Sequence, residues 1–180
     1  LYEIPPNIKY IIAKPRMKEY IEYSANIYVI YLKYLSKDDI YVYSIDEAFL
    51  DVTNYLKLYK MDEIELAKTI LKDIYNTYGL TATVGIGTNL YLAKVALDIM
   101  SKHTPTNIGY LDEELYKRKL WHHKPLTDFW QIGRGIEARL NKKRIYDMYD
   151  IAHINPKILY KEFGVNAEFL IDHSWGKETC

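Results

Sequence analysis

The chain has 180 residues, with 24 basic and 24 acidic side chains, so its formal net charge is zero. This length suits one domain or two small ones, and an apolar fraction of 49% argues against intrinsic disorder. No apolar run approaches the roughly 20 residues that a membrane-spanning helix needs, and residues 1–5 do not resemble a signal peptide. The one cysteine, Cys180, cannot form an internal disulfide or a cysteine-based zinc site, which indicates a reducing, cytoplasmic setting.

The first part of the sequence predicts alternating helices and strands. Prolines interrupt residues 1–15, which are expected to be irregular. Apolar periodicity then predicts, in chain order, a helix over 16–35, strands over 40–45 and 48–53, a helix over 62–78, a strand over 81–86, a helix that ends at residue 100 and a short strand over 107–111. Gly79 suits a helix C-terminus, and Thr88 or Asn89 suits the N-cap of the helix that follows the third strand.

The remainder, from Asp112 onward, reads as helices joined by short loops. This shift in composition suggests a boundary between an α/β part and an all-α part. From Glu114 to Arg144 there are nine Lys and Arg residues against three acids, a candidate phosphate-facing patch. A solvated helical face whose counter-charges lie elsewhere would give the same pattern.

An acidic turn is the sharpest local feature. The strands over 40–45 and 48–53 are separated only by Asp46 and Glu47, which predicts a hairpin with a two-residue acidic tip. Glycine or asparagine is the usual choice at such a tip, whereas adjacent carboxylates repel each other. Mg²⁺ takes oxygen ligands of this kind, together with substrate phosphates, although an acidic surface turn without a ligand would look the same.

The longer sequence around this turn closely resembles a known motif. Residues 43–53, YSIDEAFLDVT, resemble the signature of Y-family (translesion) DNA polymerases, which include the polymerase IV and UmuC-like enzymes. Residues 83–96, TVGIGTNLYLAKVA, resemble the strand, turn and helix that follow in that family, with Leu90 in place of its first lysine and with Lys94 retained. Residues 14–24 are similar to the segment that leads into the palm domain.

The helical part also has a counterpart in that family. Residues 126–140, LTDFWQIGRGIEARL, resemble a helix-hairpin-helix, in which two glycines two positions apart allow a close approach to a phosphate. In the usual pattern the middle residue is apolar, whereas here it is Arg134. The DNA-binding residues implied by this likeness are Gly133, Arg134, Gly135 and Arg139. A plain helix–helix turn is the alternative.

The resemblance implies an α+β fold, in which a partial polymerase palm precedes a small all-α thumb. The palm would have an antiparallel or mixed sheet with helices on one face. Residues 1–15 would end the fingers segment, 16–111 would form a palm that lacks its first strand, and 112–180 would form the thumb. The family's third carboxylate has no counterpart here, and the resemblance accounts for about half of a family member, so we expect the chain alone to lack activity.

The implied function is template-directed DNA synthesis past damaged bases, as part of DNA repair. Asp46 would bridge two Mg²⁺ ions, Glu47 would bind the catalytic one, and Lys94 would lie near the phosphates of the incoming nucleotide. The implied partners are primer–template DNA, deoxynucleoside triphosphates and, through a further C-terminal region, a sliding clamp, with no membrane.

Two other functions are consistent with parts of the pattern. A nucleotide cyclase also carries acids on a palm hairpin, but it has no use for a DNA-binding helical module. A non-catalytic DNA-binding relative would use only the basic helical part, and changes at Glu47 would then have no effect. For the polymerase and for the non-catalytic DNA-binding relative alike, we expect the affinity for DNA to fall as the salt concentration rises, because phosphate contacts release counterions.

Overall fold

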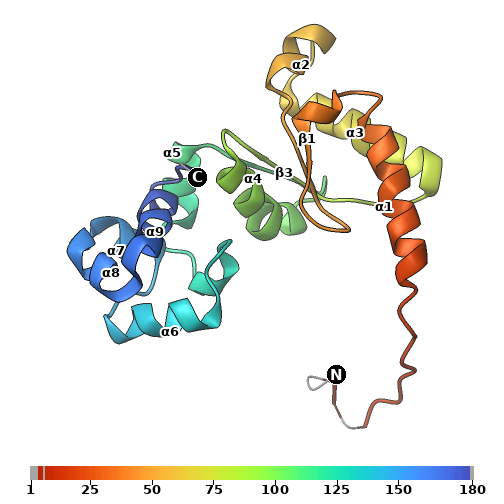
Figure 1. Cartoon of the computed structure of the whole chain (residues 1–180). Helices are drawn as coiled ribbons and strands as arrows, with labels where there is room; N and C mark the ends of the chain where they lie inside the picture. Colours follow the sequence, from red (N-terminus) through yellow and green to blue (C-terminus); the bar gives the residue numbers. More distant parts are fainter. Residues whose placement is uncertain (1–3, 6, 179–180) are drawn as a thin grey trace. The chain divides into compact units, whose positions relative to one another are not determined.

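The computed structural model describes residues 4, 5 and 7–178, which form an α+β fold in two compact units, Leu1–Asp51 and Val52–Cys180 (Figure 1). Cys180 and residues 1–3, which bear on the predicted redox setting and on the predicted lack of a signal peptide, lie outside the described residues. No helix among the described residues has both the length and the apolar character needed to cross a membrane.

The first unit contains one long helix and a β-hairpin. Its described residues before Arg16 are irregular, as predicted, and α1 covers Met17–Tyr31. A single 3₁₀ turn, η1 (Lys37–Asp39), begins at Ser36, whose hydroxyl accepts a hydrogen bond from the backbone of Asp38. The chain then enters β1 (Ile40–Val42).

The hairpin pairs β1 with β2 (Ala48–Leu50) in antiparallel register, with Ile40 opposite Leu50 and Val42 opposite Ala48. The predicted two-residue tip is wrong, because the connection covers all of residues 43–47. Both Tyr43 and Ser44 donate their backbone N–H groups to the carbonyl of Glu47. Asp46 and Glu47 lack the freedom at positive φ that a two-residue turn needs, so the loop is wider than the hydrophobic pattern indicates.

The second unit begins with two helices. The sequence did not predict α2 (Thr53–Tyr59), which starts where the second strand was expected to end and stops at Lys60 in the left-handed region, φ 54°. The predicted helix over 62–78 is confirmed as α3 (Glu63–Tyr78). A capping box between Asp62 and Glu65 begins it, and Gly79, at φ 66°, ends it.

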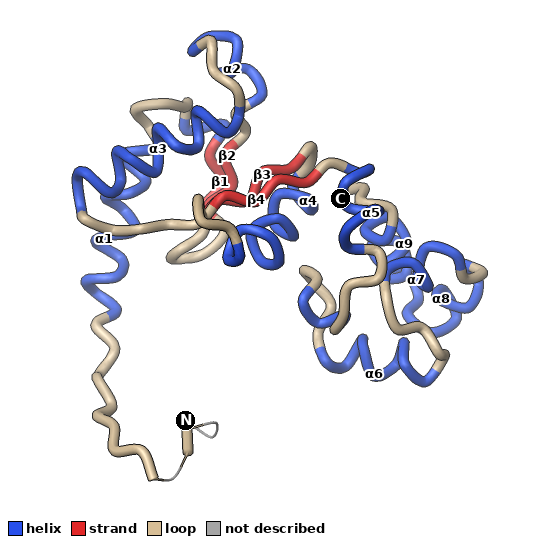
Figure 2. Tube along the Cα trace, turned by 180° about the vertical axis from the view of Figure 1, so that it is seen from behind, coloured by secondary structure: helices blue, strands red, loops and turns tan. Residues whose placement is uncertain are grey.

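Two parallel strands and a helix follow. β3 (Val84–Gly87) pairs with β4 (Ile108–Leu111), and between them run α4 (Leu90–Val95), a π-helical turn, η2 (Ala96–Met100), and a 3₁₀ turn, η3 (Ser101–His103). Figure 2 shows β3 and β4 side by side with α4 next to them. The sequence predicted one antiparallel or mixed sheet, and the described strands form two separate two-stranded sheets, one antiparallel and one parallel.

The rest of the described chain is helical, as predicted. Its elements are α5 (Glu113–Leu120), η4 (Leu126–Asp128), α6 (Arg134–Lys142), α7 (Met148–His153), α8 (Pro156–Phe163), η5 (Gly164–Asn166) and α9 (Ala167–Ser174). Their core is continuous with α4, because Tyr91, Leu92 and Leu111 belong to the same buried cluster as Tyr116 and Leu170. The predicted boundary near residue 112 is thus spanned by one hydrophobic core.

Candidate functional site

The acidic loop presents two adjacent carboxylates. Asp46 is exposed and Glu47 is half-buried at the entry to β2. The Ser44 hydroxyl donates a hydrogen bond to Oδ1 of Asp46 over 2.7 Å, and the Glu47 carbonyl accepts the two backbone N–H groups that close the loop. The loop backbone and one carboxylate oxygen are therefore held by local hydrogen bonds.

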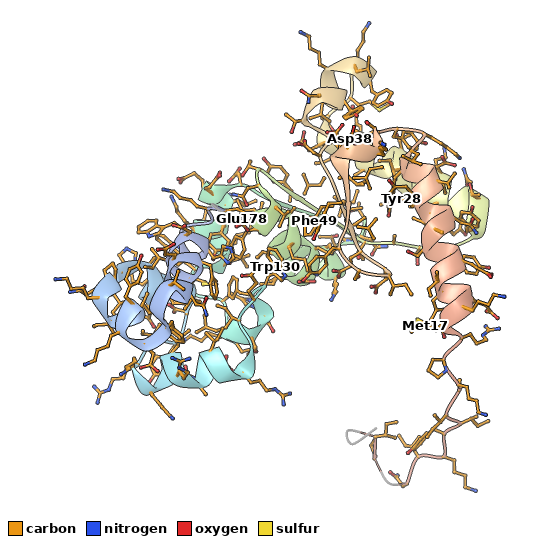
Figure 3. All side chains as sticks on the ribbon, viewed as in Figure 1. Met17, Tyr28, Asp38, Phe49, Trp130 and Glu178 are labelled. Carbon is orange, nitrogen blue, oxygen red and sulfur yellow. The ribbon has the colours of Figure 1, made fainter. Side chains whose placement is uncertain are left out.

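Aromatic side chains support the strands on either side of this loop. Phe49, labelled in Figure 3, packs against Tyr43 in an edge-on arrangement, with ring centroids 5.6 Å apart, and lies over Tyr41 on the paired strand at 6.4 Å. Cross-strand aromatic pairs of this kind stabilise an antiparallel ladder. The carboxylates are thus carried by a braced hairpin.

The two carboxylates suit a hard cation. Mg²⁺ commonly uses one or two protein carboxylates and takes its other oxygen ligands from water and phosphates, and an exposed Asp beside a half-buried Glu offers such donors. Among the described residues no cluster of three or more His, Cys, Asp or Glu side chains is arranged to hold a metal ion. Asp46 and Glu47 therefore fit a site that is shared with other oxygen donors.

Lys94 belongs to the second unit, whereas the two carboxylates belong to the first. It occupies the last turn of α4 and is itself buried, with Nζ 3.2 Å from Oδ1 of Asp98 in the π-helical turn η2. Sequence reasoning singled out Lys94 and missed Asp98, although the spacing of four residues is a signal for a pair on one helix face.

Helix α4 is held in place through its N-cap residue, Asn89. Asn89 caps it as predicted, because its Oδ1 accepts a hydrogen bond from the backbone of Leu92 over 2.8 Å. Nδ2 of the same side chain donates to the carbonyl of Gly176, just beyond α9. The preceding Thr88 donates its hydroxyl to Glu113 at the start of α5. The turn between β3 and α4 is thereby tied to two helices of the helical part.

A buried polar cluster, which the sequence did not indicate, lies beneath α4. The hydroxyls of Tyr91 and Tyr116 are 3.1 Å apart, and the Tyr91 ring stacks on His173 with a centroid distance of 3.9 Å. Nε2 of His173 is 3.3 Å from Glu178. Burial raises the pKa of both tyrosines above their ordinary value and lowers that of His173, an effect that Glu178 partly opposes. These residues join α4, α5 and α9.

The predicted DNA-binding residues lie in and next to α6. Gly133 is the N-cap of this helix and, lacking a side chain, leaves the helix without a side-chain cap. A Cβ added at Gly133 or Gly135 would meet no atom within 4 Å, and neither residue adopts positive φ. Among the described residues, neither close packing nor positive φ requires glycine at these two positions. Arg134 is exposed beside them.

Arg139 differs from Arg134, because it is engaged within the chain. Its Nε donates to Oε1 of Glu162 over 2.9 Å, and its guanidinium also donates to the Glu162 carbonyl and lies 4.3 Å from the ring centroid of Phe163. Lys143 is 3.4 Å from the same carboxylate. Hydrogen bonds from Arg139 and Lys143 lower the pKa of Glu162. Arg139 thus joins α6 to α8.

Comparison with known proteins identifies relatives with DNA-related names. Residues 2–98 match the impB/mucB/samB family. Over 176 residues the chain is 36% identical to UvrX of Bacillus subtilis (strain 168), a protein named for UV-damage repair, and this match covers 98% of the chain and 41% of UvrX. It is 34% identical over 160 residues to DNA polymerase IV 2 of the same organism, which covers 89% of the chain and 38% of that protein.

Solved structures show the same fold. DinB from Sulfolobus solfataricus superimposes with a TM-score of 0.77 at 32% identity, covering 94% of the chain and 49% of DinB. An insertion ternary complex of Dbh DNA polymerase superimposes with a TM-score of 0.79 at 30% identity, covering 94% of the chain and 48% of that polymerase. The chain therefore spans somewhat less than half the length of the proteins that it matches.

Proposed function

The chain belongs to the impB/mucB/samB family, and on that premise we propose that it is the palm and thumb part of a Y-family DNA polymerase that copies damaged templates. One observation carries the proposal. The acidic loop at 43–47, the strand β3 and the helix α4 all lie within the family match over residues 2–98. In this proposal residues 16–111 form the palm and 112–180 the thumb.

Asp46 and Glu47 are the residues that would hold Mg²⁺ in this proposal. When bound, two such ions activate the primer hydroxyl and stabilise the leaving pyrophosphate. The protein's part is to hold the carboxylates still. The hydrogen bond from Ser44 to Asp46 and the two backbone bonds to Glu47 support this role, because oriented ligands need no reorganisation during the reaction.

Lys94 is the proposed contact for the phosphates of the incoming deoxynucleoside triphosphate. An ammonium group near the phosphates balances their negative charge during transfer. The leucine at position 90 replaces a second cation on the same helix, so Lys94 would carry this interaction alone within α4.

The helical part is proposed to hold primer–template DNA without reading its sequence. The first backbone N–H groups of α6 have no partner within the helix and suit a phosphate, and the open space at Gly133 and Gly135 supports a close approach. Arg134 is the proposed ion-pairing residue. Arg139 would contact DNA only by sharing or leaving Glu162. We further propose a cytoplasmic setting for this activity and a sliding clamp as a partner.

Primer extension tests the function directly. The full-length product of the gene that encodes this chain is supplied with Mg²⁺, the four deoxynucleoside triphosphates and a primed template, either undamaged or carrying a lesion. We expect template-directed extension on both templates and complete loss of it when EDTA removes the metal, because two carboxylates alone do not neutralise the phosphates. DNA binding without extension under all conditions would instead identify a non-catalytic DNA-binding relative.

A further inference from the structure

The ion pair between Lys94 and Asp98 spans the junction of α4 and the π-helical turn η2. Nζ of Lys94 lies 3.2 Å from Oδ1 of Asp98. The lysine side chain is 9% exposed and the aspartate side chain 29%. Lysines are seldom this buried unless a counter-charge accompanies them, and Asp98 provides such a counter-charge.

The backbone beneath this pair has little freedom to shift. A Cβ on Gly85 would lie 2.1 Å from the carbonyl oxygen of Ala93, and one on Gly109 would lie 2.5 Å from that of Ala96. The glycines of β3 and β4 thus let the helix rest directly, backbone against backbone, on the strands. Because the backbone of residues 93–97 packs directly on the strands, the position of the Lys94 ammonium depends on its side-chain torsions and on the groups that bind it, of which Asp98 is one.

Helix stability is a weak explanation for the pair. At a spacing of four residues, the favourable order places the acid before the base, and here the base precedes the acid. Asp98 also lies within a single π-helical turn, an irregularity that is frequent at functional sites. The pair therefore does more for the position and charge of Lys94 than for the stability of α4.

We propose that Asp98 is a positioning residue, which holds the Lys94 ammonium in place before the triphosphate of the incoming nucleotide binds. This inference rests on the proposed function, since it assigns to Asp98 a part in the phosphate contact of Lys94. The Lys94 side chain is largely buried and already forms an ion pair. Little ordering of this side chain therefore remains for the step in which a phosphate binds.

Steady-state primer extension with the full-length gene product tests this role, with KM for the nucleotide and kcat measured separately. Asp98→Asn should raise KM on the order of tenfold and change kcat by less than about twofold, as loss of binding in both ground state and transition state requires. Asp98→Glu, which restores the charge, should recover most of the affinity. Glu114→Gln is the matched control, because Glu114 also pairs with a lysine of its own helix, Lys117, at 3.4 Å, and it should leave KM unchanged.

A double-mutant cycle separates this inference from the proposed function. Lys94→Met should raise KM at least as much as Asp98→Asn, and the double variant should be no worse than Lys94→Met alone. If Lys94→Met raises KM while Asp98→Asn leaves it unchanged or lowers it, the positioning role is overturned and the proposed function stands. If Lys94→Met has no effect, the phosphate contact itself is wrong, and the role of Asp98 is overturned with it.

The melting temperature of each variant is measured to exclude unfolding as the cause of a change in KM. Every assay is run well below that temperature, and Asp98→Ser replaces Asp98→Asn if the latter does not fold. Equal losses in Asp98→Glu and Asp98→Asn would contradict the proposal, because they would show that side-chain shape, not the charge, matters at this position.

Discussion

At the scale of single residues, His173 joins α9 to α4 through an imidazole that favours the neutral form. Its ring stacks on Tyr91, contacts Phe169 at a centroid distance of 5.7 Å and faces the Glu178 carboxylate. Burial lowers the pKa of His173, and the nearby charges of Glu178 and Asp172 partly oppose this effect. A buried residue of this kind makes the stability of the helical part depend on pH.

We predict that stability falls as the pH drops below about 6.5, the ordinary histidine pKa. Below this pH the unfolded chain binds a proton at His173 more readily than the folded chain does, so acid favours unfolding. Above about pH 6.5 the histidine is neutral in both states and the stability is fully retained. Thermal unfolding at pH 5 and pH 8 measures the difference, and His173→Gln should remove on the order of 1 kcal/mol of the pH dependence.

The account of His173 is contradicted if His173→Gln leaves the pH dependence of thermal unfolding as it is in the wild type.

At the scale of elements, glycines have two different uses in this chain. Those in β3 and β4 are required by packing, since a Cβ on Gly85 or Gly87 would overlap the backbone of α4. Those that begin α6 face open space. The first group is explained by the fold, and the second is explained by the proposed contact with DNA.

This contrast predicts opposite effects on stability and binding. Gly135→Ala should raise the free energy of unfolding by a few tenths to about 1 kcal/mol, because alanine favours a helix, and should weaken DNA binding on the order of tenfold, because a methyl group intrudes on the phosphate. Gly85→Ala should destabilise the chain by about 3 kcal/mol or more through overlap with α4.

Denaturant unfolding and fluorescence anisotropy with labelled duplex DNA measure the two quantities. Anisotropy at several salt concentrations should also give an affinity that decreases with salt. Unchanged DNA affinity in a stabilised Gly135→Ala variant would show that α6 does not approach the phosphates.

The sequence predicted those elements whose signals are local. The cap at Asn89, the stop at Gly79 and the limits of α3 follow from side chains that act within a few residues. The five-residue loop at 43–47 and the helix α2 were not predicted. The residue pattern that is typical of a strand continues through this loop and into the first residue of α2. Local periodicity does not distinguish a strand end from the first turn of a helix.

The candidate site was predictable only in part. Asp46, Glu47 and Lys94 were found because a long motif contains them. The bond from Asn89 to Gly176 and the pairing of Arg139 with Glu162 join residues 87 and 23 positions apart. Such contacts depend on how helices pack, which one sequence without a structure does not reveal.

At the scale of the whole molecule, the chain spans somewhat less than half the length of the solved polymerases that it resembles. Two carboxylates are provided by the acidic loop, and the third expected from the family resemblance has no counterpart in this sequence. The central claim is therefore that Asp46 and Glu47 act as metal ligands in a longer protein.

Primer extension by the full-length gene product, wild type beside Glu47→Gln, tests this claim most directly when DNA affinity is measured on the same samples. The substitution preserves shape and removes the charge that holds the metal, so extension should fall at least roughly a hundredfold while DNA affinity stays within about twofold. Undiminished extension in Glu47→Gln would show that Glu47 holds no catalytic metal and would contradict the account.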